Sequence, residues 1–352
     1  MRRVVITAVA AITPQGETCE SLEAAFSGRT APLSPAGGLT ARVARCKCEL
    51  PEAASRTSAL ALAAFSEAAE SAGLAAGELA SAGVLCGTSK GALDELLTLG
   101  PEGLPAYLAG PASEVASRLG CRGLLASPAA ACATGTVTVA LGASIVASGE
   151  AEVVLAGAAE SALHPLLIAG YMRMGVYSRG GARPMTRDRD GFIAGEGAGA
   201  LVLEDEDHAL ARGAVPLCRV GAWALGSDPG SAWNPTPGGA PLGDVIRRAV
   251  CGLPNPPAAV FAHGTATVAG DAAESAAIGA LLDVPVTALK GCFGHLLGAA
   301  GAAEMAVAAR SVAGRKLPPV AGLGQPDETL PVRPLDKPSP LLGDCVLVIG
   351  AG

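Results

Sequence analysis

The stretch Ala131-Cys132-Ala133-Thr134-Gly135 opens a run of residues that carries no charge as far as Ser148. A second stretch, Gly291-Cys292-Phe293-Gly294-His295, opens another Gly- and Ala-rich run about 160 residues later, close to half of the chain. Each stretch follows a short strand-like segment. This repetition predicts two similar α/β halves that face each other, with a site between two helix N-termini.

The rest of the chain alternates between two kinds of segment. Apolar runs bounded by Gly or Asp predict strands at residues 4–12, 83–86, 153–156, 198–203, 259–262, 284–288 and 346–349. Ala-rich stretches with helical spacing predict helices at 58–72, 136–147 and 298–312. This alternation is typical of α/β proteins with buried sheets. Residues 205–213 predict a short polar surface helix, and we place the boundary between an N-terminal half (1–213) and a C-terminal half (214–352) directly after it.

Composition excludes several classes of protein. Of the 352 residues, 50% are hydrophobic and 16% are charged, which excludes a disordered chain. The net charge of −7 argues against nucleic acid as a partner, because binding phosphates needs a basic excess. Residues 124–148 are long enough to cross a membrane, but their Pro, Gly, Ser and Thr content favours a helix buried in a soluble core. Residues 4–12 lack a cleavage site and predict a strand rather than a signal peptide, so we expect a cytoplasmic protein.

The ten cysteines are scattered along the chain, which indicates reduced thiols rather than a disulfide framework. Cys46 and Cys48 form the one close pair. No second pair and no nearby histidine completes a zinc-binding set, so we predict no metal site.

Cys132 is the first candidate for chemistry. It lies at the start of a predicted helix, where backbone N–H groups and the helix dipole favour a thiolate. Its neighbours Ala131, Ala133 and Gly135 are small and leave room for a substrate. The alternative interpretation is a structural cysteine buried in the core.

Two of the four histidines are candidates as well. His263 ends an apolar strand, and His295 precedes a Gly-rich run. Polar residues at the carboxyl ends of buried strands are where α/β proteins place active sites. A hydrogen-bonded core histidine is the alternative for each. His208 lies among acids and is expected to be solvated, and His164 is assigned no role.

Lys290 closes the apolar run 284–289, and a buried lysine needs a partner. Glu304 is the one acid between Lys290 and Asp327 in the sequence, which predicts an ion pair between Lys290 and Glu304.

Two further motifs have plainer interpretations. Gly195-Glu196-Gly197-Ala198-Gly199 resembles part of a nucleotide-binding loop, but it precedes a strand instead of joining a strand to a helix. We therefore expect it to provide close backbone packing. Residues 183–191 are rich in Arg and Asp and predict a charged turn at the surface or at an interface.

Taken together, these motifs resemble the β-ketoacyl-acyl carrier protein synthases of the decarboxylating, Cys-His-His type. The resemblance covers nearly the whole chain. It begins with residues 1–34, which are similar to the family's opening strand, turn and helix. It rests on five ordered motifs, at residues 1–34, 131–135, 183–204, 262–274 and 290–304. It implies the thiolase-like fold, in which two duplicated α/β halves form a five-layer αβαβα arrangement that is usually dimeric.

The resemblance also implies a mechanism. The Cys132 thiolate would attack an acyl thioester carried on the phosphopantetheine of an acyl carrier protein, with its own backbone N–H as one oxyanion donor. His263 and His295 would then donate hydrogen bonds to the enolate formed when malonyl carrier protein loses CO2. The product would be a 3-oxoacyl thioester. The ion pair of Lys290 with Glu304 would maintain the electrostatic field and the hydrogen bonds around the two histidines.

Other residues take their expected roles from the same resemblance. Thr265 and Thr267 would bind the pantetheine arm, and Asp271 and Glu274 would support the first histidine motif. The resemblance implies no metal ion and no redox cofactor. It implies an acyl carrier protein as partner, and either a homodimer or a heterodimer with a second ketosynthase-like subunit.

The chain departs from the family pattern in four places. Residues 87–124, which in the family shape the acyl pocket and the dimer contact, are abridged, and 180–183 are shortened. Residues 55–69 correspond to the basic helix that docks the acidic carrier protein, yet they carry only Arg56. We therefore expect docking through other residues, or weak docking. Residues 344–352 resemble the strand that leads into the family's gating loop, whose phenylalanine and following strand have no counterpart here. We expect reduced turnover or a contribution from a partner subunit.

Two alternatives to the synthase interpretation follow. One is a chain-length-factor-like partner that shapes the pocket of a catalytic subunit. The other is an acyltransferase that uses Cys132 only to transfer acyl groups. The sequence leaves the acyl chain length open, and it also leaves open whether the pathway makes fatty acids or polyketides.

Overall fold

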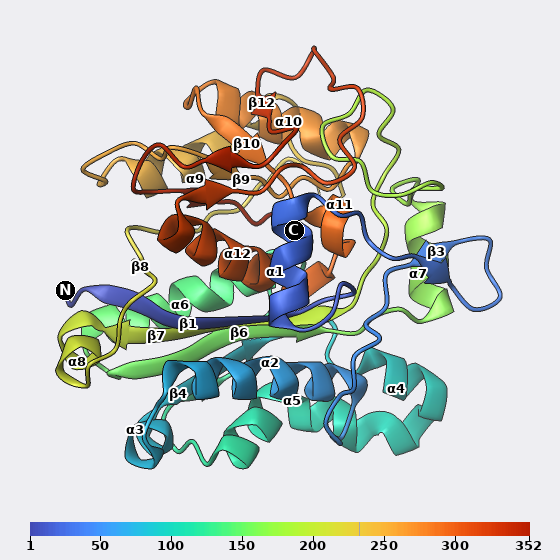
Figure 1. Cartoon of the computed structure of the whole chain (residues 1–352). Coiled ribbons are helices and arrows are strands. Elements are labelled where there is room, and N and C mark those ends of the chain that lie inside the picture. Colours follow the sequence, from blue (N-terminus) through green and yellow to red (C-terminus); the bar gives the residue numbers. More distant parts are fainter. Residues whose placement is uncertain (232) are drawn as a thin grey trace.

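The computed structural model describes residues 1–231 and 233–352, without the side chains of 105, 106, 108 and 109. The chain forms five layers (Figure 1). Helices α2 (Arg56–Ala72) and α5 (Leu104–Leu119) cover one side of a six-stranded sheet, and α6 (Thr134–Ser148) and α12 (Ala300–Gly314) cover the other. A four-stranded sheet follows, and α9 (Ala240–Val250) and α10 (Val268–Gly279) close the stack. The predicted αβαβα arrangement is confirmed.

The first sheet has the strand order β5-β4-β6-β7-β1-β8. Its strands are β1 (Val4–Ile12), β4 (Gly83–Gly87), β5 (Leu125–Ala126), β6 (Val153–Glu160), β7 (Gly197–Asp205) and β8 (Cys218–Arg219). Strands β4 and β6 are parallel, whereas β7 runs antiparallel to both β6 and β1. Every residue of β1, β6 and β7 is buried, because helices cover both faces of the sheet, and this explains their nearly continuous apolar sequences.

The second sheet is smaller, with the order β12-β10-β9-β14 and parallel pairing throughout. Its strands are β9 (Val260–Phe261), β10 (Pro285–Thr287), β12 (Arg333–Pro334) and β14 (Leu347–Val348). Ile246 of α9 and Ile278 of α10 pack on its outer face against Val260 and Val286. Strands β9, β10 and β14 are each shorter than the apolar run that predicted them, and no predicted run covers β12. Two small ribbons pair β2 (Ser34–Pro35) with β3 (Arg42–Val43), and β11 (Lys316–Leu317) with β13 (Ser339–Pro340).

The remaining elements connect these layers. They are α1 (Thr18–Ser27), α3 (Ala76–Ser81), α4 (Leu93–Leu99), α7 (Pro165–Arg173), α8 (Glu206–Ala211), α11 (Lys290–Phe293) and the short 3-10 turns η1 (Gly100–Gly103), η2 (Pro237–Gly239) and η3 (Leu297–Ala299). Strand β8 follows residue 213 but pairs with β1 of the first sheet. The boundary at residue 213 stays a prediction.

The two central helices meet at their N-terminal ends. A Cβ atom on Gly135 would overlap the backbone nitrogen of Ala302, and one on Gly301 would lie 2.8 Å from the nitrogen of Thr136. The contact is reciprocal, as expected for two related halves. The predicted repeat is nevertheless displaced. Residues 290–293 form the separate helix α11, and α12 begins only at Ala300, so Gly301 rather than Cys292 matches the start of α6.

Glycines of β6 and β7 allow the same close approach. A Cβ on Gly199 would overlap the backbone nitrogen of Ala303, and one on Gly157 would overlap the carbonyl oxygen of Gly199. Close packing of backbones therefore holds α12 on β7 and β7 on β6. This confirms the interpretation of residues 195–199 as a packing motif.

The stretch Ala131–Ser148 is long and apolar enough to cross a membrane, with a mean hydropathy of 1.6. Half of it is buried inside the protein. Val139, Ala143 and Val146 of this helix belong to the largest apolar cluster, which also contains residues of β6 and α12. The structure therefore accounts for its composition by packing between the two sheets.

The prediction that His208 is solvated was wrong. Helix α8 forms as expected, but the His208 ring lies over Glu204, with Nδ1 3.1 Å from a carboxylate oxygen. Glu204 is fully buried and is also held by two hydrogen bonds from Arg212, of 2.8 and 2.6 Å. His208 and Arg212 of this segment thus form an ion cluster with Glu204 of β7, whereas Asp207 is exposed.

Candidate active site

Cys132 lies in a tight turn that directly precedes α6. Ala131 has a φ of 46°, and the Ala133 nitrogen donates to the Ala130 carbonyl at 2.9 Å. The Thr134 hydroxyl closes the turn, accepting from the Ala130 nitrogen at 2.8 Å and donating to the Ala131 carbonyl at 2.7 Å. The turn presents Cys132 at the N-terminal end of the helix, where helix N–H groups are free to interact with an anion.

Backbone strain gathers around the predicted motifs. Of the five described non-glycine residues with a positive φ, four lie beside a candidate residue, and they are Ala131, Met185, Ala266 and Leu297. A left-handed conformation costs such residues about 1–2 kcal/mol. Conformations of this kind cluster at functional sites, where the surrounding structure holds them.

The two candidate histidines face each other. The ring centroids of His263 and His295 are 5.4 Å apart, with an angle of 84° between the rings. Both rings are buried. His295 is fixed through its backbone, since its nitrogen donates to Ile193 at 2.7 Å and its carbonyl accepts from Gly195 at 2.8 Å. The structure thus brings together two residues that lie 32 positions apart in the sequence.

The predicted ion pair forms beneath the histidines. Lys290 Nζ lies 2.9 Å from Glu304 Oε1 and 3.3 Å from His263 Nδ1, and it also donates to the His263 carbonyl. An ammonium group has only donors, so His263 Nδ1 accepts and the neutral ring carries its proton on Nε2. Burial lowers the pKa of His263, and the charge of Lys290 lowers it further. Burial and Lys290 also lower the pKa of His295, so both rings are neutral.

Two buried carboxylates shape the loop after β9. Glu274 accepts the backbone N–H groups of His263 and Gly264 at 2.6 and 2.8 Å. Asp271 accepts those of Ala266 and Met185 at 3.0 and 2.7 Å. Burial raises the pKa of Glu274 to about 7 and that of Asp271 to about 6, although these N–H donors oppose the shift.

The two threonines of the same loop lie together. Thr265 Oγ1 is 2.9 Å from Thr267 Oγ1, and Thr267 caps α10 by accepting from the Gly270 nitrogen at 3.2 Å. Both side chains are half-buried. The pair therefore places two hydroxyl groups in the loop that follows His263.

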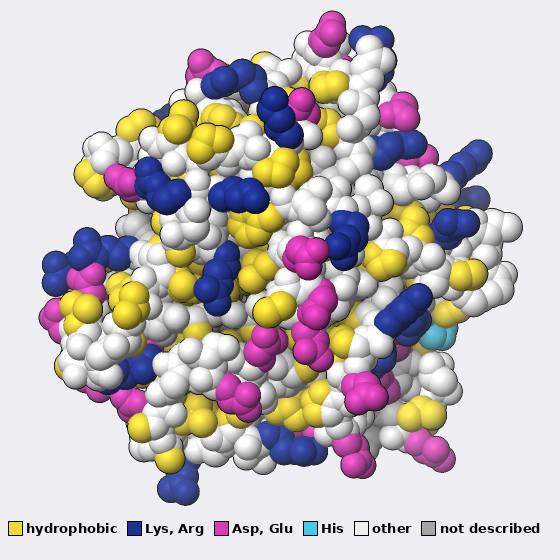
Figure 2. Space-filling view, viewed as in Figure 1, with side chains coloured by type: hydrophobic (Ala, Val, Ile, Leu, Met, Phe, Trp, Pro, Cys, Tyr) yellow, Lys and Arg dark blue, Asp and Glu magenta, His cyan; other side chains and the backbone are white. Residues whose placement is uncertain are grey.

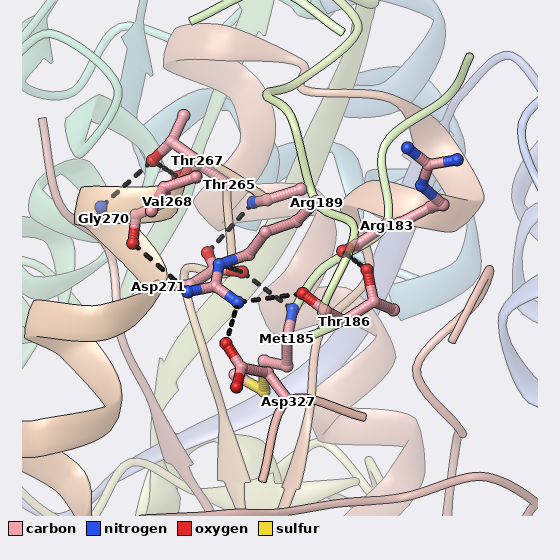
Figure 3. Close-up of polar contacts among 12 residues, drawn as sticks. Arg183, Met185, Thr186, Arg189, Thr265, Thr267, Val268, Gly270, Asp271 and Asp327 are labelled. Atoms are coloured by element: carbon pink, nitrogen blue, oxygen red, sulfur yellow. Dashed lines mark hydrogen bonds and ion pairs between the residues drawn. The ribbon is translucent and has the colours of Figure 1, made fainter. Parts of the chain in front are cut away.

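The prediction of a surface turn at residues 183–191 was wrong for Arg189. Its guanidinium is buried, with Nη1 2.5 Å from Asp327 and Nε 3.9 Å from Asp271. Figure 3 shows Arg189 between these two carboxylates, close to Met185 and to the loop of Thr265 and Thr267. The arginine thus ties the segment to the first histidine loop. Its neighbour Arg183 pairs with Asp188 and Asp190 on the more exposed side.

A shared apolar cluster connects Cys132 to the histidines. It packs against the cluster that contains Phe192 and Leu297. The Phe192 ring lies edge-on to His295, with centroids 5.1 Å apart, and Tyr171 packs on Phe192 at 5.3 Å. Burial raises the pKa of the Cys132 thiol, while the charges of Lys90 and Lys290 lower it.

Sequence reasoning missed two charged residues near Cys132. Glu160 ends β6 and is fully buried, and Lys90 follows β4 and is half-buried. The sequence contained a signal for both residues. His263 was selected because it is a polar residue at the end of a buried strand, and the same rule fits Glu160 and Lys90. It was not applied to these two strands.

The end of the described chain lies against the nucleophile turn. A Cβ on Gly352 would lie 2.5 Å from the Cys132 nitrogen, and one on Gly350 would overlap the Thr136 hydroxyl. Residues 344–352 therefore lead into the site, as the resemblance implied.

Arg56 was expected as the one basic residue of the carrier-docking helix. In the structure its guanidinium is already paired within the protein, because it donates two hydrogen bonds to the buried Glu196 at 2.9 and 2.6 Å. On the face shown in Figure 2, acidic side chains gather in the middle of the view, over α1. An acidic partner would be repelled there.

Comparison with known proteins places the chain in a family. Residues 36–209 match the model of the β-ketoacyl synthase N-terminal domain, and residues 217–323 match that of its C-terminal domain. The 3-oxoacyl-[acyl-carrier-protein] synthase 2 of Vibrio cholerae is 36% identical over 228 residues, which cover 60% of this chain and 55% of that protein. That of Synechocystis is 31% identical and covers 93% of this chain and 89% of that protein. The chain thus spans about half the length of the first relative and most of the second.

Solved structures agree in fold. The ishigamide ketosynthase/chain length factor has a TM-score of 0.88 at 25% identity and covers all of this chain and 96% of its own. A β-ketoacyl synthase from Burkholderia phymatum has a TM-score of 0.82 at 26% identity, covering 98% and 94%. The structure titled AntDE:AntF, a type II acyl-carrier protein in complex with its ketosynthase, has a TM-score of 0.90 at 23% identity, covering 100% and 96%. With both domain models matched in order and the five-layer fold shared, this chain belongs to the β-ketoacyl synthase family.

Proposed function

We propose that this protein is a 3-oxoacyl-[acyl-carrier-protein] synthase that condenses an acyl thioester with malonyl carrier protein in the elongation of fatty acids or polyketides. One observation carries the proposal. Lys290 holds the His263 ring with Nε2 as the donor, and His263 faces His295 beside the cluster that contains Cys132. Two neutral histidine donors next to a cysteine nucleophile suit an enolate that must be stabilised close to a bound acyl group.

The first step loads the acyl group. Cys132 sulfur attacks the thioester carbonyl, the new C–S bond forms, and the pantetheine thiol leaves with the proton lost by Cys132. The backbone N–H of Cys132 would bind the oxyanion. Burial keeps this thiol protonated in the free protein, and the positive charges of Lys90 and Lys290 favour the thiolate as it forms.

The second step forms the carbon–carbon bond. Malonyl thioester loses CO2, and the electron pair of the broken bond becomes an enolate. The Nε2–H of His263 donates to the enolate oxygen, with His295 as the second donor. The enolate carbon then attacks the acyl group on Cys132, and the cysteine thiolate leaves. Lys290 acts through His263, and Glu304 balances the buried ammonium charge.

The remaining roles follow from position. Thr265 and Thr267 would bind the pantetheine arm, and Asp271 and Glu274 would hold the backbone of their loop. The mechanism uses no metal ion or redox cofactor. We further propose an acyl carrier protein as partner, a homodimer or a heterodimer with a second ketosynthase-like subunit, and a cytoplasmic location. The carrier would dock away from Arg56, whose charge is already bound by Glu196.

Intact-protein mass spectrometry tests this function. The protein is mixed first with an acyl carrier protein thioester and then with malonyl carrier protein, beside the variants Cys132→Ala and His263→Ala. We expect an acyl adduct on the wild type that disappears with release of a 3-oxoacyl product. Cys132→Ala should take up no acyl group, and His263→Ala should be acylated without condensing. Acylation without condensation in the wild type would point to an acyltransferase. No acylation would point to a chain-length-factor-like partner.

A further inference from the structure

A cavity of about 220 Å³ opens beside α11, in a part of the molecule that has no role in the proposed mechanism. Thr30, Ala31 and Leu33, which follow α1, line one part of it, and residues 180–183 line another. The second segment is the one that is shortened relative to the family pattern, which leaves less chain to fill the space. Because an engineered cavity of about 150 Å³ can hold benzene or xenon, this one is large enough for a small molecule.

The inner wall of the cavity is made by residues that are bonded to the two histidines. Lys290 lines the cavity, and its Nζ lies 3.3 Å from His263 Nδ1. Ile193 lines it as well, and its carbonyl accepts a hydrogen bond from the His295 nitrogen at 2.7 Å. Gly294, which directly precedes His295, belongs to the same wall. The cavity therefore comes within one residue of each ring.

The cavity lies apart from the thioester side of the site. Within the described part of the chain, its lining includes neither Cys132 nor Thr265 and Thr267. Arg183 lines the cavity, and Figure 3 shows its side chain pointing away from Arg189 and from the loop of the two threonines. The cavity thus approaches the histidines without passing the proposed pantetheine site.

The lining favours a small neutral molecule that can accept a hydrogen bond. Most of its residues are Gly, Ala, Leu or Ile. The terminal nitrogens of Arg183 pair with Asp188 and Asp190, whereas its Nε is buried and has no partner among the described residues. The two carboxylates would repel a bound anion. A neutral oxygen can still accept from the Nε–H.

We propose that this cavity binds the CO2 lost from malonyl thioester and leads it to solvent. The inference rests on the proposed function, because it concerns the second product of the condensation. The bond between C2 of the malonyl group and its carboxylate carbon breaks, the electron pair stays in the enolate, and CO2 leaves as a neutral molecule without a proton. The pantetheine arm fills the side of Thr265 and Thr267 during this step, so the gas leaves past Lys290 and Gly294.

A separate exit makes the bond breakage productive. CO2 that stays beside the enolate can add back to it and restore the malonyl group. Its departure ends this reversal, and the rate of departure depends on an open path, as in other product-release steps. The apolar part of the lining accommodates the uncharged gas, and the Arg183 Nε–H offers a hydrogen bond to one of its oxygens.

The first test measures the carbon-13 isotope effect on CO2 release from malonyl carrier protein during condensation. Ala31→Phe narrows the cavity and keeps the backbone hydrogen bond from residue 31 to the Gly291 carbonyl, and Leu33→Ala widens the cavity. Ala76→Phe makes the first change at an exposed position in α3 and serves as the control.

In Ala31→Phe, we expect the excess of the isotope effect over one to fall at least twofold, because trapped CO2 adds back before it leaves. Leu33→Ala and Ala76→Phe should keep the wild-type value. If Ala31→Phe slows CO2 release while the isotope effect stays constant or rises, the bond-breaking step itself is disturbed and the exit role is overturned. Condensation by the wild type would then still support the proposed function.

The second test needs no turnover, and it uses crystals pressurised with CO2. We expect CO2 in the cavity of the wild type and of Leu33→Ala, within hydrogen-bond distance of Arg183 Nε, and none in Ala31→Phe. An empty wild-type cavity would overturn the inference. CO2 in the crystal together with an isotope effect that Ala31→Phe leaves unchanged would show binding at high pressure only, which also overturns the exit. If CO2 occupies the cavity but the wild type forms no 3-oxoacyl product, the binding site stands and the proposed function fails.

Discussion

Lys290 Nζ lies 3.3 Å from His263 Nδ1, and this contact decides which nitrogen of the histidine carries the proton. Because the ammonium can only donate, Nδ1 accepts and the neutral ring carries its proton on Nε2. The same ammonium is paired with Glu304 at 2.9 Å, and both side chains are almost fully buried. The charge of Lys290 therefore affects both which nitrogen of His263 is protonated and the stability of the folded protein.

Replacement of Lys290 by Met should reduce condensation about 100-fold or more, the effect of losing an oriented donor in a closed site. Acylation of Cys132 should fall much less. The measurement is the rate of 3-oxoacyl product formation beside the rate of acyl-enzyme formation by mass spectrometry. Equal losses in both rates would contradict a role through His263.

The same variant should also lose about 3–5 kcal/mol of stability, because it leaves the Glu304 carboxylate buried without its partner. Lys290→Met combined with Glu304→Leu should regain most of that stability without regaining condensation. Urea unfolding measures the first effect and product formation the second. A double variant that condenses normally would rule out the tautomer argument.

Alkylation of Cys132 should be slow at neutral pH. Burial raises the pKa of this thiol above its usual range, so the thiolate fraction is small at pH 7 and grows through the alkaline range. The rate of labelling by iodoacetamide at Cys132, followed by peptide mapping from pH 6 to 10, should rise across the range. A rate that levels off below pH 7 would contradict the burial argument.

Stability should depend on pH through Glu274. Its pKa is about 7 in the folded protein and about 4.3 in an unfolded chain, so the folded state binds the extra proton between these values. The stability that protonated Glu274 contributes is complete below about pH 4 and is lost as the pH rises through 7. His263 and His295 act in the opposite direction below about pH 6.5, because folding lowers their pKa.

The difference between the wild type and Glu274→Gln isolates this residue. The free energy of unfolding of the wild type, relative to the variant, should be greatest at about pH 4 and below and should shrink towards pH 7.5. Urea titrations at several pH values measure it. A difference that stays constant with pH would show that the pKa of Glu274 is not raised by folding.

Gly199→Ala should destabilise the protein by about 1–3 kcal/mol or more, because the added Cβ would overlap the backbone of α12 at Ala303. Gly170→Ala is the matched control. Gly170 lies in α7 with nothing near its missing Cβ, so alanine there should stabilise by about 0.5–1 kcal/mol. Thermal unfolding of the two variants should move in opposite directions.

Arg189→Met should cost about 3–5 kcal/mol, since it removes the buried cation between Asp271 and Asp327. The loop of Thr265 and Thr267 should loosen, which raises the KM for pantetheine thioesters. Arg183→Met, at a more exposed ion pair, should cost at most about 1 kcal/mol. Similar costs for the two variants would show that Arg189 does not anchor the loop.

The sequence by itself determined the class of fold and the residues at the centre of the site. Strands β1, β6 and β7 are buried on both faces, so their apolar runs were visible without any partner. Cys132 and His263 were found because a helix start and a strand end are local features. The pairing of Lys290 with Glu304 was predictable because a buried cation needs an acid and the sequence offered one nearby.

Only the tertiary structure decided where most charged side chains lie. Arg189 comes from a segment that predicts a charged turn at the surface or an interface, and His208 from one that predicts a polar surface helix, yet the carboxylates of Asp327 and Glu204 hold their side chains against the protein. Lys90 and Glu160 meet through Ser89 although 70 positions separate them in the chain. Periodicity along a chain reports which segments are buried. It does not report which charges meet, because that depends on how distant elements approach one another, and here the close contacts of Gly135, Gly199 and Gly301 set that approach.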